Sequence, residues 1–445
     1  LPERATQVVA RTFERLENML ALAALIAMAF LPCVEAITRV MGVPGVTGST
    51  VIVQHMTLWI GFLGAIIAAR ESRLLSLTKP VEIETDERKG FSYWFARSVA
   101  VTVSLILAYA SFILVKTESE YPRDILPGIP VWVVEVIMPL GFFLIAMEML
   151  RTSKKEPVFR ALLIAIPIVI GAIALGETLQ TPVVLWAGII AVILSLAFGA
   201  PIFVGLGGLA VLLFWHDGVP IAAVPAEMYR IVVSPTLPTI PLFTLAGYIL
   251  AEGGASKRLV EVFRHWFGWI PGGTPVMITL LCGFFTTLTG GSGVTILALG
   301  GLLLPMLISE KYPRKFSVGL ITVSGSLGLL FPPSLPAIIY GVTAGVPINK
   351  IFLAGIVPGF LLIAMVAAWG MRQGLISKVP RKPFRPAEAF QAFWKAKWEA
   401  FIPVFILIGI FGGFTTLVEV AALTVVYVLV VEVFVYRDVR LKELP

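Results

Sequence analysis

Long apolar runs alternate with short polar segments along the chain, and the length of the runs indicates what they are. A helix needs roughly 20 apolar residues to cross the hydrocarbon core of a bilayer. The first third of the sequence reaches about that length four times, at 18–41, 51–69, 91–115 and 131–150. The pattern predicts an all-α membrane protein with many spanning helices.

Basic residues orient these helices, because Lys and Arg concentrate in cytoplasmic loops. Loop 42–50 contains neither residue type, whereas loop 70–90 and segment 151–160 contain several. The basic residues in these two segments are Arg70, Arg73, Lys79, Arg88, Lys89, Arg151, Lys154, Lys155 and Arg160. Both ends of the four-helix block are therefore expected on the cytoplasmic side.

Residues 151–182 are interpreted as a connector, with a polar start that contains Pro157. An apolar run at 161–176 within it predicts one extra spanning helix that runs outward. We therefore predict a four-helix module at 1–150 and a second module at 183–445.

The second module continues the helical pattern. Its uninterrupted apolar runs predict helices at 183–200, 202–215, 236–252, 351–370, 401–414 and 419–436. The stretch 216–235 is too polar to span and predicts an interfacial loop. In 257–269, charged and apolar positions alternate, which predicts an amphipathic helix on the cytoplasmic membrane surface.

Two apolar segments of this module are interrupted by small residues and prolines. One is 288–294, Leu-Thr-Gly-Gly-Ser-Gly-Val, and the other is 324–334, which ends in Phe-Pro-Pro-Ser. An unsatisfied backbone group in hydrocarbon costs several kcal/mol, so a broken helix persists there only when it is buried in protein or lines a wet cavity. Its free N–H and C=O groups can then bind anions and cations. The pattern predicts a transporter.

The first interruption lies in segment 272–310, between apolar arms at 274–289 and 294–308. Basic residues flank both ends, which places both ends on one side of the membrane. An ordinary pair of spanning helices with a tight turn is one interpretation, and a re-entrant hairpin with its tip at 289–293 is the other. The second is favoured because several residues shorten the first arm, namely Pro271, Gly272, Gly273 and Pro275.

The second interruption predicts a broken helix over 316–344. Pro332 and Pro333 remove two backbone donors and disfavour helix in the residue before them. The carbonyls near 328–330 therefore lose their partners. A merely kinked structural helix is the alternative interpretation.

Composition agrees with a membrane protein. Only 14% of the 445 residues are charged and 58% are hydrophobic, which leaves too little polar surface for a soluble globule. The formal charge of +7 comes from loop residues without a basic face, so nucleic acid is not an expected partner. Cys33 and Cys282 form no disulfide framework or metal-ligand spacing, and the three histidines have no nucleophile beside them. An enzyme is therefore not expected.

The two interruptions supply the candidate ion-binding and substrate-binding residues. These are Thr289, Gly290, Gly291, Ser292, Gly293, Ser324, Gly325, Ser326, Gly328, Pro332, Pro333 and Ser334. For Na⁺, which needs several oxygen ligands, the best candidates are the Ser292 hydroxyl and the carbonyls of Gly325 and Gly328. The alternative for any one serine is a hydrogen bond back to its own helix.

Four ionisable residues lie near the ends of predicted spanning helices, namely Glu35, His55, Glu135 and Glu148. We expect them to extend toward the membrane surface or to pair across helices rather than to titrate during transport.

Several blocks resemble the large membrane subunit of the tripartite ATP-independent periplasmic (TRAP) transporters. They are Gly290–Gly293, Glu310–Phe316, Gly325–Tyr340 and Phe352–Gly359. The first module more weakly resembles the small four-helix subunit of that family, at Glu14–Glu17, Trp59–Ala65, Ala69–Arg73 and Pro139–Leu144. A fusion of the two subunits also explains the connector and its extra helix.

The resemblance implies an elevator-type symporter in the bacterial inner membrane that is driven by sodium, without an organic cofactor. It implies import of organic acids, such as dicarboxylates, sugar acids or keto acids, from a periplasmic substrate-binding protein. It also implies a second, inverted copy of the hairpin and broken helix, whereas this sequence stops at Pro445 after one copy. We expect an incomplete large subunit, with a separate chain as the alternative. The tip has Gly-Gly-Ser-Gly where relatives commonly have Gly-Ser-Ser, so one expected hydroxyl is absent.

Three other functions stay open. An intramembrane enzyme would need clustered ionisable residues, and a scaffold subunit would not need the glycine and proline breaks. A single-component sodium/anion transporter with similar hairpins is the closest alternative. It differs in needing no soluble binding protein.

Overall fold

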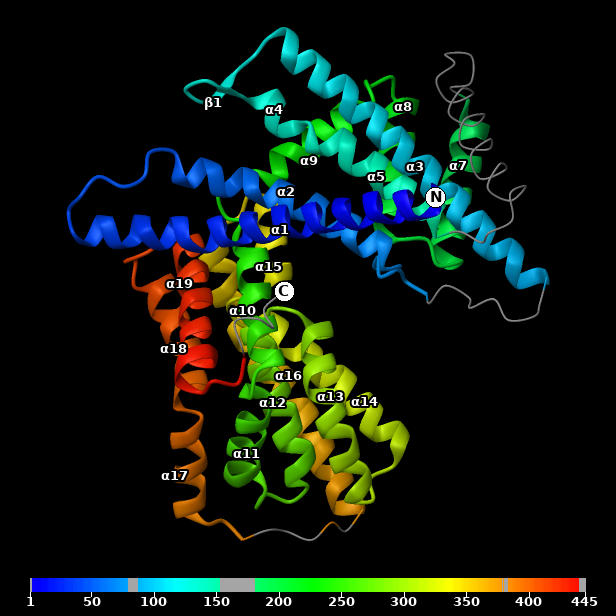
Figure 1. Ribbon diagram of the computed structural model, residues 1–445. Coiled ribbons are helices and arrows are strands. Elements are labelled where there is room, and N and C mark those ends of the chain that lie inside the picture. The colour runs from blue at the N-terminus through cyan, green and yellow to red at the C-terminus, as the bar shows by residue number, and fades with distance from the viewer. Residues whose placement is uncertain (1, 79–86, 153–180, 378, 380–382, 440–445) are drawn as a thin grey trace. The chain divides into compact units, whose positions relative to one another are not determined.

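The structure is a computed structural model that describes residues 2–78, 87–152, 181–377, 379 and 383–439. Most of the described chain is helical (Figure 1). Seven described helices are long and apolar enough to cross a membrane, or eight if a bent pair counts as one span. The polytopic all-α prediction is therefore confirmed. The extra spanning helix predicted at 161–176 lies outside the described residues.

Internal contacts divide the chain into two compact units, and helices α1 and α2 contribute to both. The first unit comprises Leu1–Ala24 and His55–Val233, and the second comprises Leu25–Gln54 and Ser234–Pro445. The module boundaries predicted at 150 and 183 rest on the apolar pattern and the polar connector, not on internal contacts, and they stay a prediction.

The four helices predicted for the first module are present, and they belong to the first unit except for Leu25–Val40 of α1 and Ser49–Gln54 of α2. They are α1 (Pro2–Val40), α2 (Ser49–Arg70), α3 (Glu87–Glu120), and the pair α4 (Val131–Glu135) and α5 (Ile137–Arg151). Helices α7 (Pro182–Ala197), α8 (Ile202–His216) and α9 (Ala223–Val232) follow. The short strands β1 (Asp124–Leu126) and β2 (Ile129–Pro130) pair antiparallel between α3 and α4.

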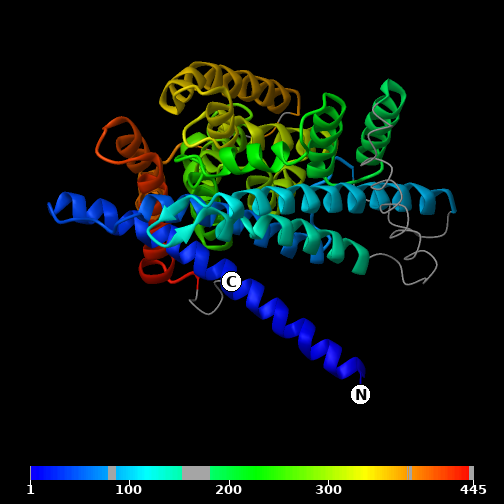
Figure 2. The ribbon, with the colours of Figure 1, turned by 90° about the horizontal axis from the view of Figure 1, so that it is seen from above.

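The core of the first unit lies between α2, α3 and α5, and α3 and α5 lie side by side (Figures 1 and 2). Phe62 and Phe142 meet edge to face, with ring centroids 5.0 Å apart. Gly141 makes this possible, since a Cβ there would lie 2.3 Å from the Phe62 ring. Arg70 pairs with the buried Glu17 at 2.6 Å, which offsets the cost of burying that carboxylate.

Helix α9 corrects the prediction of a loop at 216–235. Val224, Met228 and Val232 recur every fourth residue, which places them on one helix face toward the core. The polar residues of the stretch correctly excluded a span. They obscured a short helix with one apolar face.

The second unit contains the hairpin and the broken helix. Its elements up to the break are α10 (Thr239–Glu252), α11 (Ala255–Phe267), α12 (Gly273–Thr289), α13 (Ser292–Ser309), α14 (Arg314–Leu327) and the 3₁₀ turn η2 (Gly328–Leu330). After the break come α15 (Leu335–Ala344), α16 (Ile348–Ile376), α17 (Pro386–Lys395), α18 (Lys397–Phe411), α19 (Leu417–Leu429) and the π-helical turn η3 (Val430–Val435). Helix α17 was missed, because its ten residues lie in a basic loop.

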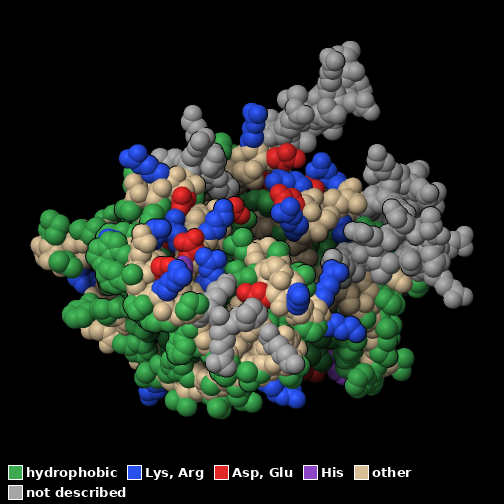
Figure 3. Space-filling model, turned by 90° about the horizontal axis from the view of Figure 1, so that it is seen from below, with side chains coloured by type: hydrophobic (Ala, Val, Ile, Leu, Met, Phe, Trp, Pro, Cys, Tyr) green, Lys and Arg blue, Asp and Glu red, His purple; other side chains and the backbone are tan. Residues whose placement is uncertain are grey.

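Helix α12 is the centre of this unit. It is almost wholly buried and packs against α10, α11, α13, α14 and α16. In contrast, α16 exposes large apolar side chains, with Val357 76% exposed, as expected for a helix that faces lipid. The end of the unit that carries α11 and α17 presents Lys and Arg side chains (Figure 3). Lys257 of α11 and Lys395 of α17 are both exposed. This charge distribution agrees with a cytoplasmic position for that end.

Candidate ion-binding site at the hairpin tip and the helix break

The hairpin tip is a two-residue turn between α12 and α13. Gly290 has a φ of +66°, which favours glycine, and Gly291 is extended and precedes the first residue of α13, Ser292. A Cβ on Gly290 would lie 2.8 Å from the Leu335 side chain. The tip of the hairpin is therefore packed against the residue that follows the helix break.

The break itself has a defined start and end. The helix that runs through α14 and η2 stops at Leu330, and α15 leaves at an angle of 46°. Phe331 is extended, and Pro332 and Pro333 contribute no N–H groups. The Ser334 hydroxyl accepts a hydrogen bond from the Ala337 amide at 3.3 Å and so caps the new helix. The predicted broken helix is confirmed. The prediction that the carbonyls near 328–330 lose their partners is wrong at Gly328, because its carbonyl oxygen accepts from the Phe331 amide at 3.1 Å.

Three fully buried threonines join the hairpin to the broken helix. The Thr286 hydroxyl lies 2.8 Å from the Thr295 hydroxyl and 2.9 Å from the Gly325 carbonyl oxygen. The Thr289 and Thr295 hydroxyls are 3.0 Å apart. Because these residues come from both arms of the hairpin and from α14, the network concentrates neutral oxygens inside an apolar unit.

Two of the three predicted sodium ligands lie beside this network. A Cβ on Gly325 would be 3.6 Å from the Ser292 carbonyl oxygen, so these residues are neighbours. The Ser292 hydroxyl makes no hydrogen bond within the described part of the chain. Gly328, the third, lies one turn beyond Gly325 and packs on α12, where an added Cβ would be 2.3 Å from the Gly283 carbonyl oxygen.

The remaining candidates divide into buried and exposed positions. Ser324 is fully buried, with its hydroxyl 3.5 Å from that of Thr279, and the Gly291 carbonyl accepts from Thr295. Ser326 is exposed and its hydroxyl donates to the Val323 carbonyl at 2.8 Å, the bond to its own helix weighed as the alternative. Gly293 is exposed as well.

Sequence reasoning missed Thr286 and Thr295. A signal was present, since Thr279, Thr286 and Thr289 are seven and three residues apart and so share one face of α12. Polar residues on one face of an otherwise apolar arm indicate a buried polar contact.

The other intramembrane ionisable residues have varied surroundings. The His55 Nε2 atom lies 2.8 Å from the Tyr229 hydroxyl, so His55 pairs across helices as predicted. Glu148 accepts from Arg151 of its own helix at 2.7 Å. Glu135 is 1% exposed, and its Oε2 atom has no hydrogen-bond partner among the described residues.

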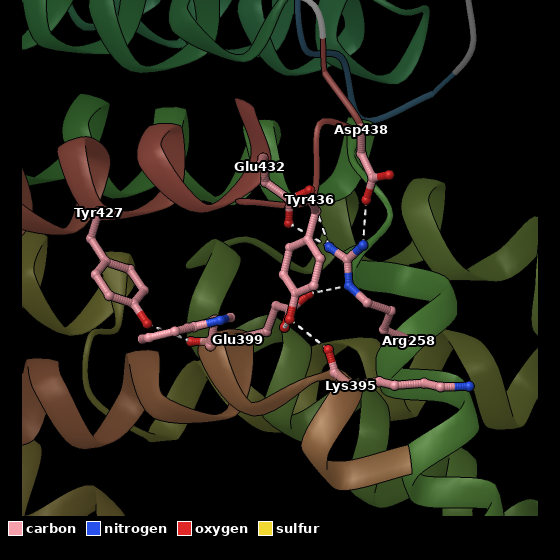
Figure 4. A network of polar contacts seen from close by, with 8 residues as sticks. Arg258, Lys395, Glu399, Tyr427, Glu432, Tyr436 and Asp438 are labelled. Atoms are coloured by element: carbon pink, nitrogen blue, oxygen red, sulfur yellow. Dashed lines mark hydrogen bonds and ion pairs between the residues drawn. The ribbon is translucent and has the colours of Figure 1, made fainter. Parts of the chain in front are cut away.

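A second polar network surrounds Arg258 of α11 (Figure 4). Its guanidinium donates to Glu399 of α18, to Asp438, and to Glu432 of η3 at 2.9 Å. It also lies over the Tyr436 ring, with Cζ 3.6 Å from the centroid. Burial alone lowers the pKa of Arg258, but the three carboxylates outweigh it and the pKa is raised. One side chain thus ties three segments of the second unit together.

Comparison with known families agrees with both halves of the chain. Residues 188–445 match the family described as "Tripartite ATP-independent periplasmic transporter, DctM component". Residues 10–155 match the one described as "Tripartite ATP-independent periplasmic transporters, DctQ component".

Individual relatives are TRAP transporter permease proteins. The isethionate TRAP transporter permease protein DctMQ of Oleidesulfovibrio alaskensis is 27% identical in an alignment 443 residues long that covers 95% of this chain and 68% of that protein. The C4-dicarboxylate TRAP transporter large permease protein DctM of Vibrio cholerae is 33% identical over 252 residues, 56% of each chain. The 2,3-diketo-L-gulonate TRAP transporter large permease protein YiaN of Escherichia coli is 33% identical over 230 residues, 52% of this chain and 54% of that one.

The chain spans about half the length of these large permease proteins. The match to both family descriptions, in the predicted order, confirms the resemblance seen in the sequence. The chain belongs to the TRAP transporter family, as a multi-pass inner-membrane permease that joins small-subunit and large-subunit regions in one polypeptide.

Proposed function

We propose that this chain forms part of a sodium-coupled symporter that imports organic acids delivered by a periplasmic substrate-binding protein. The observation that carries the proposal is the group of buried hydroxyl and carbonyl oxygens where the hairpin tip meets the helix break. The family description supports it, because transport that is independent of ATP needs another energy source and an ion gradient supplies one. The relatives named above are permeases for isethionate, C4-dicarboxylates and diketogulonate, which are organic acids.

In this proposal Na⁺ binds between the Ser292 hydroxyl and the carbonyl oxygens of Gly325 and Gly328. Neutral oxygens suit a monovalent cation, and a carbonyl oxygen that already accepts one hydrogen bond keeps a second lone pair. No group of His, Cys, Asp and Glu with the arrangement of a metal site occurs among the described residues, so the oxygens near the tip are the better candidates.

The other candidates would shape the site or receive the substrate anion. Thr289, Gly290, Gly291 and Gly293 lie at the hairpin tip, where no described side chain caps the start of α13, so its first amides can face an anion. The helix break contributes Ser324, Ser326, Pro332, Pro333 and Ser334.

We further propose an elevator motion, in which the segment with the hairpin and the broken helix moves against a fixed scaffold built from residues 1–150. The positive-φ turn at Gly290 and the 46° break both lie in the proposed moving segment. A helix break of this kind places the binding site inside the packed unit, so the site moves together with that unit.

Uptake of a radiolabelled dicarboxylate by proteoliposomes tests the coupling and the partner, with the complete transporter that contains these segments. We expect accumulation only with both an inward sodium gradient and the cognate binding protein, because each is proposed to be obligatory. A potassium gradient of equal size is the control. Sodium-driven uptake without binding protein would support a single-component transporter, and uptake indifferent to sodium would contradict the ion coupling.

A further inference from the structure

A cavity of about 300 Å³ lies inside the second unit, separate from the hairpin and the break. It is lined by the ends of α1 and α2, by the residues before α10, and by the first turn of α19. The neighbouring connections 41–48 and 412–416 contain no Lys or Arg, so the charge rule places this cavity at the periplasmic side of the membrane.

The cavity wall carries charges of both signs. Arg39 makes a two-pronged ion pair with Glu419, and Glu419 also accepts from the Thr416 amide at 2.8 Å. Both carboxylate oxygens of Glu419 therefore already accept hydrogen bonds. The Arg39 side chain stays 50% exposed. Glu35, one helical turn before Arg39, lines the same cavity and has no side-chain partner among the described residues.

The first turn of α2 adds a further positive element. Ser49, the first residue of this 22-residue helix, lines the cavity and is 2% exposed. The partial positive charge at the helix start favours an anionic group there. The cavity thus offers one free carboxylate to a cation, and a guanidinium and a helix start to an anion, which together suit a zwitterion.

The surface around these helix ends is apolar. The large exposed side chains there are Val34, Ile37, Val40, Met41, Val43 and Phe414. Val40 is 89% exposed and Phe414 75% exposed, which indicates contact with acyl chains rather than with water. A ligand for this place needs a zwitterionic head and apolar tails.

We propose that the cavity binds the headgroup of a zwitterionic aminophospholipid. The ammonium group donates to Glu35, and the phosphate lies against Arg39 and the first turn of α2. The volume is at the lower end for ligand cavities, which suits a headgroup whose tails remain in the bilayer. A bound lipid of this kind would hold the ends of α1, α2 and α19 together.

Native mass spectrometry of the purified, delipidated chain tests this proposal. The chain is mixed with phosphatidylethanolamine, phosphatidylcholine or phosphatidylglycerol of identical acyl chains. We expect phosphatidylethanolamine to be retained best, because the choline group cannot donate hydrogen bonds and the glycerol group carries no positive charge. Equal retention of the three lipids by the unmodified chain would overturn the proposal without any variant.

The variant Glu35→Gln keeps the side-chain size and removes the charge. We expect a roughly fivefold loss of phosphatidylethanolamine affinity, with phosphatidylglycerol binding unchanged. The matched control is Glu120→Gln, which alters an exposed carboxylate at the end of α3. Unchanged phosphatidylethanolamine binding in Glu35→Gln would refute the assignment. Competition by soluble phosphoethanolamine or succinate as effective as by the lipid would show a site for a soluble ligand and would refute it too.

Discussion

Replacing Arg258 with glutamine is expected to destabilise the second unit by about 3–5 kcal/mol, since it leaves buried carboxylates without their cation. Glu399 and Glu432 are both fully buried, and Arg258 is the cation that pairs with each of them among the described residues. The measurement is thermal unfolding of the purified chain in detergent, followed by tryptophan fluorescence or by precipitation.

Two comparisons make the Arg258 result specific. Arg264→Gln changes an exposed arginine on the same helix and is expected to shift stability by less than about 0.5 kcal/mol. Adding Glu432→Gln to Arg258→Gln should recover part of the loss, because one of the uncompensated charges is then removed. If Arg258→Gln unfolds at the same temperature as Arg264→Gln, the network has no role in stability.

Replacing Gly328 with alanine is expected to disturb the contact between the helix break and α12. The added Cβ would lie 2.3 Å from the Gly283 carbonyl oxygen and 2.8 Å from the Thr287 amide nitrogen, and backbone atoms cannot rotate away. Overpacking of this kind costs about 1–3 kcal/mol or more, and here it also displaces the segment proposed to bind the ion. Thermal stability and sodium-dependent uptake should both fall.

Gly319→Ala is the matched control, because Gly319 belongs to α14 and a Cβ there meets nothing within 4 Å. Alanine has the higher helix propensity, so this variant should be neutral or slightly stabilised. Equal behaviour of the Gly328 and Gly319 variants would show that the close approach at Gly328 does not constrain the break.

The helices and the break could be predicted from sequence because their causes are local. Apolar length alone located the four helices of the first module. Pro332 and Pro333 act on the residue beside them, so the end of the helix at Leu330 followed from chemistry within a few positions. The turn at Gly290 was visible for the same reason, as only glycine readily adopts that backbone conformation.

What sequence reasoning missed depends on contacts between distant residues. Arg258 contacts Glu399 and Glu432, which are 141 and 174 positions away in the sequence. No local sequence pattern predicts that pairing. The link from Thr286 to the Gly325 carbonyl spans 39 positions and joins two elements predicted separately. In the same way, Glu35 was expected to extend toward the membrane surface or to pair across helices, whereas the fold brings it to one cavity with Arg39 and Glu419.

The central claim, that sodium binds where the hairpin tip meets the helix break, is tested most directly by uptake against sodium concentration in proteoliposomes. The complete transporter is compared with Ser292→Ala, with the pair Pro332→Ala and Pro333→Ala, and with Ser309→Ala as an exposed control. Losing one oxygen ligand should raise the half-saturating sodium concentration about tenfold, equivalent to about 1.4 kcal/mol. The double proline variant should also raise the half-saturating sodium concentration, because its restored amide N–H groups would compete with sodium for the carbonyl oxygens. An unchanged half-saturating concentration in both variants would contradict the account.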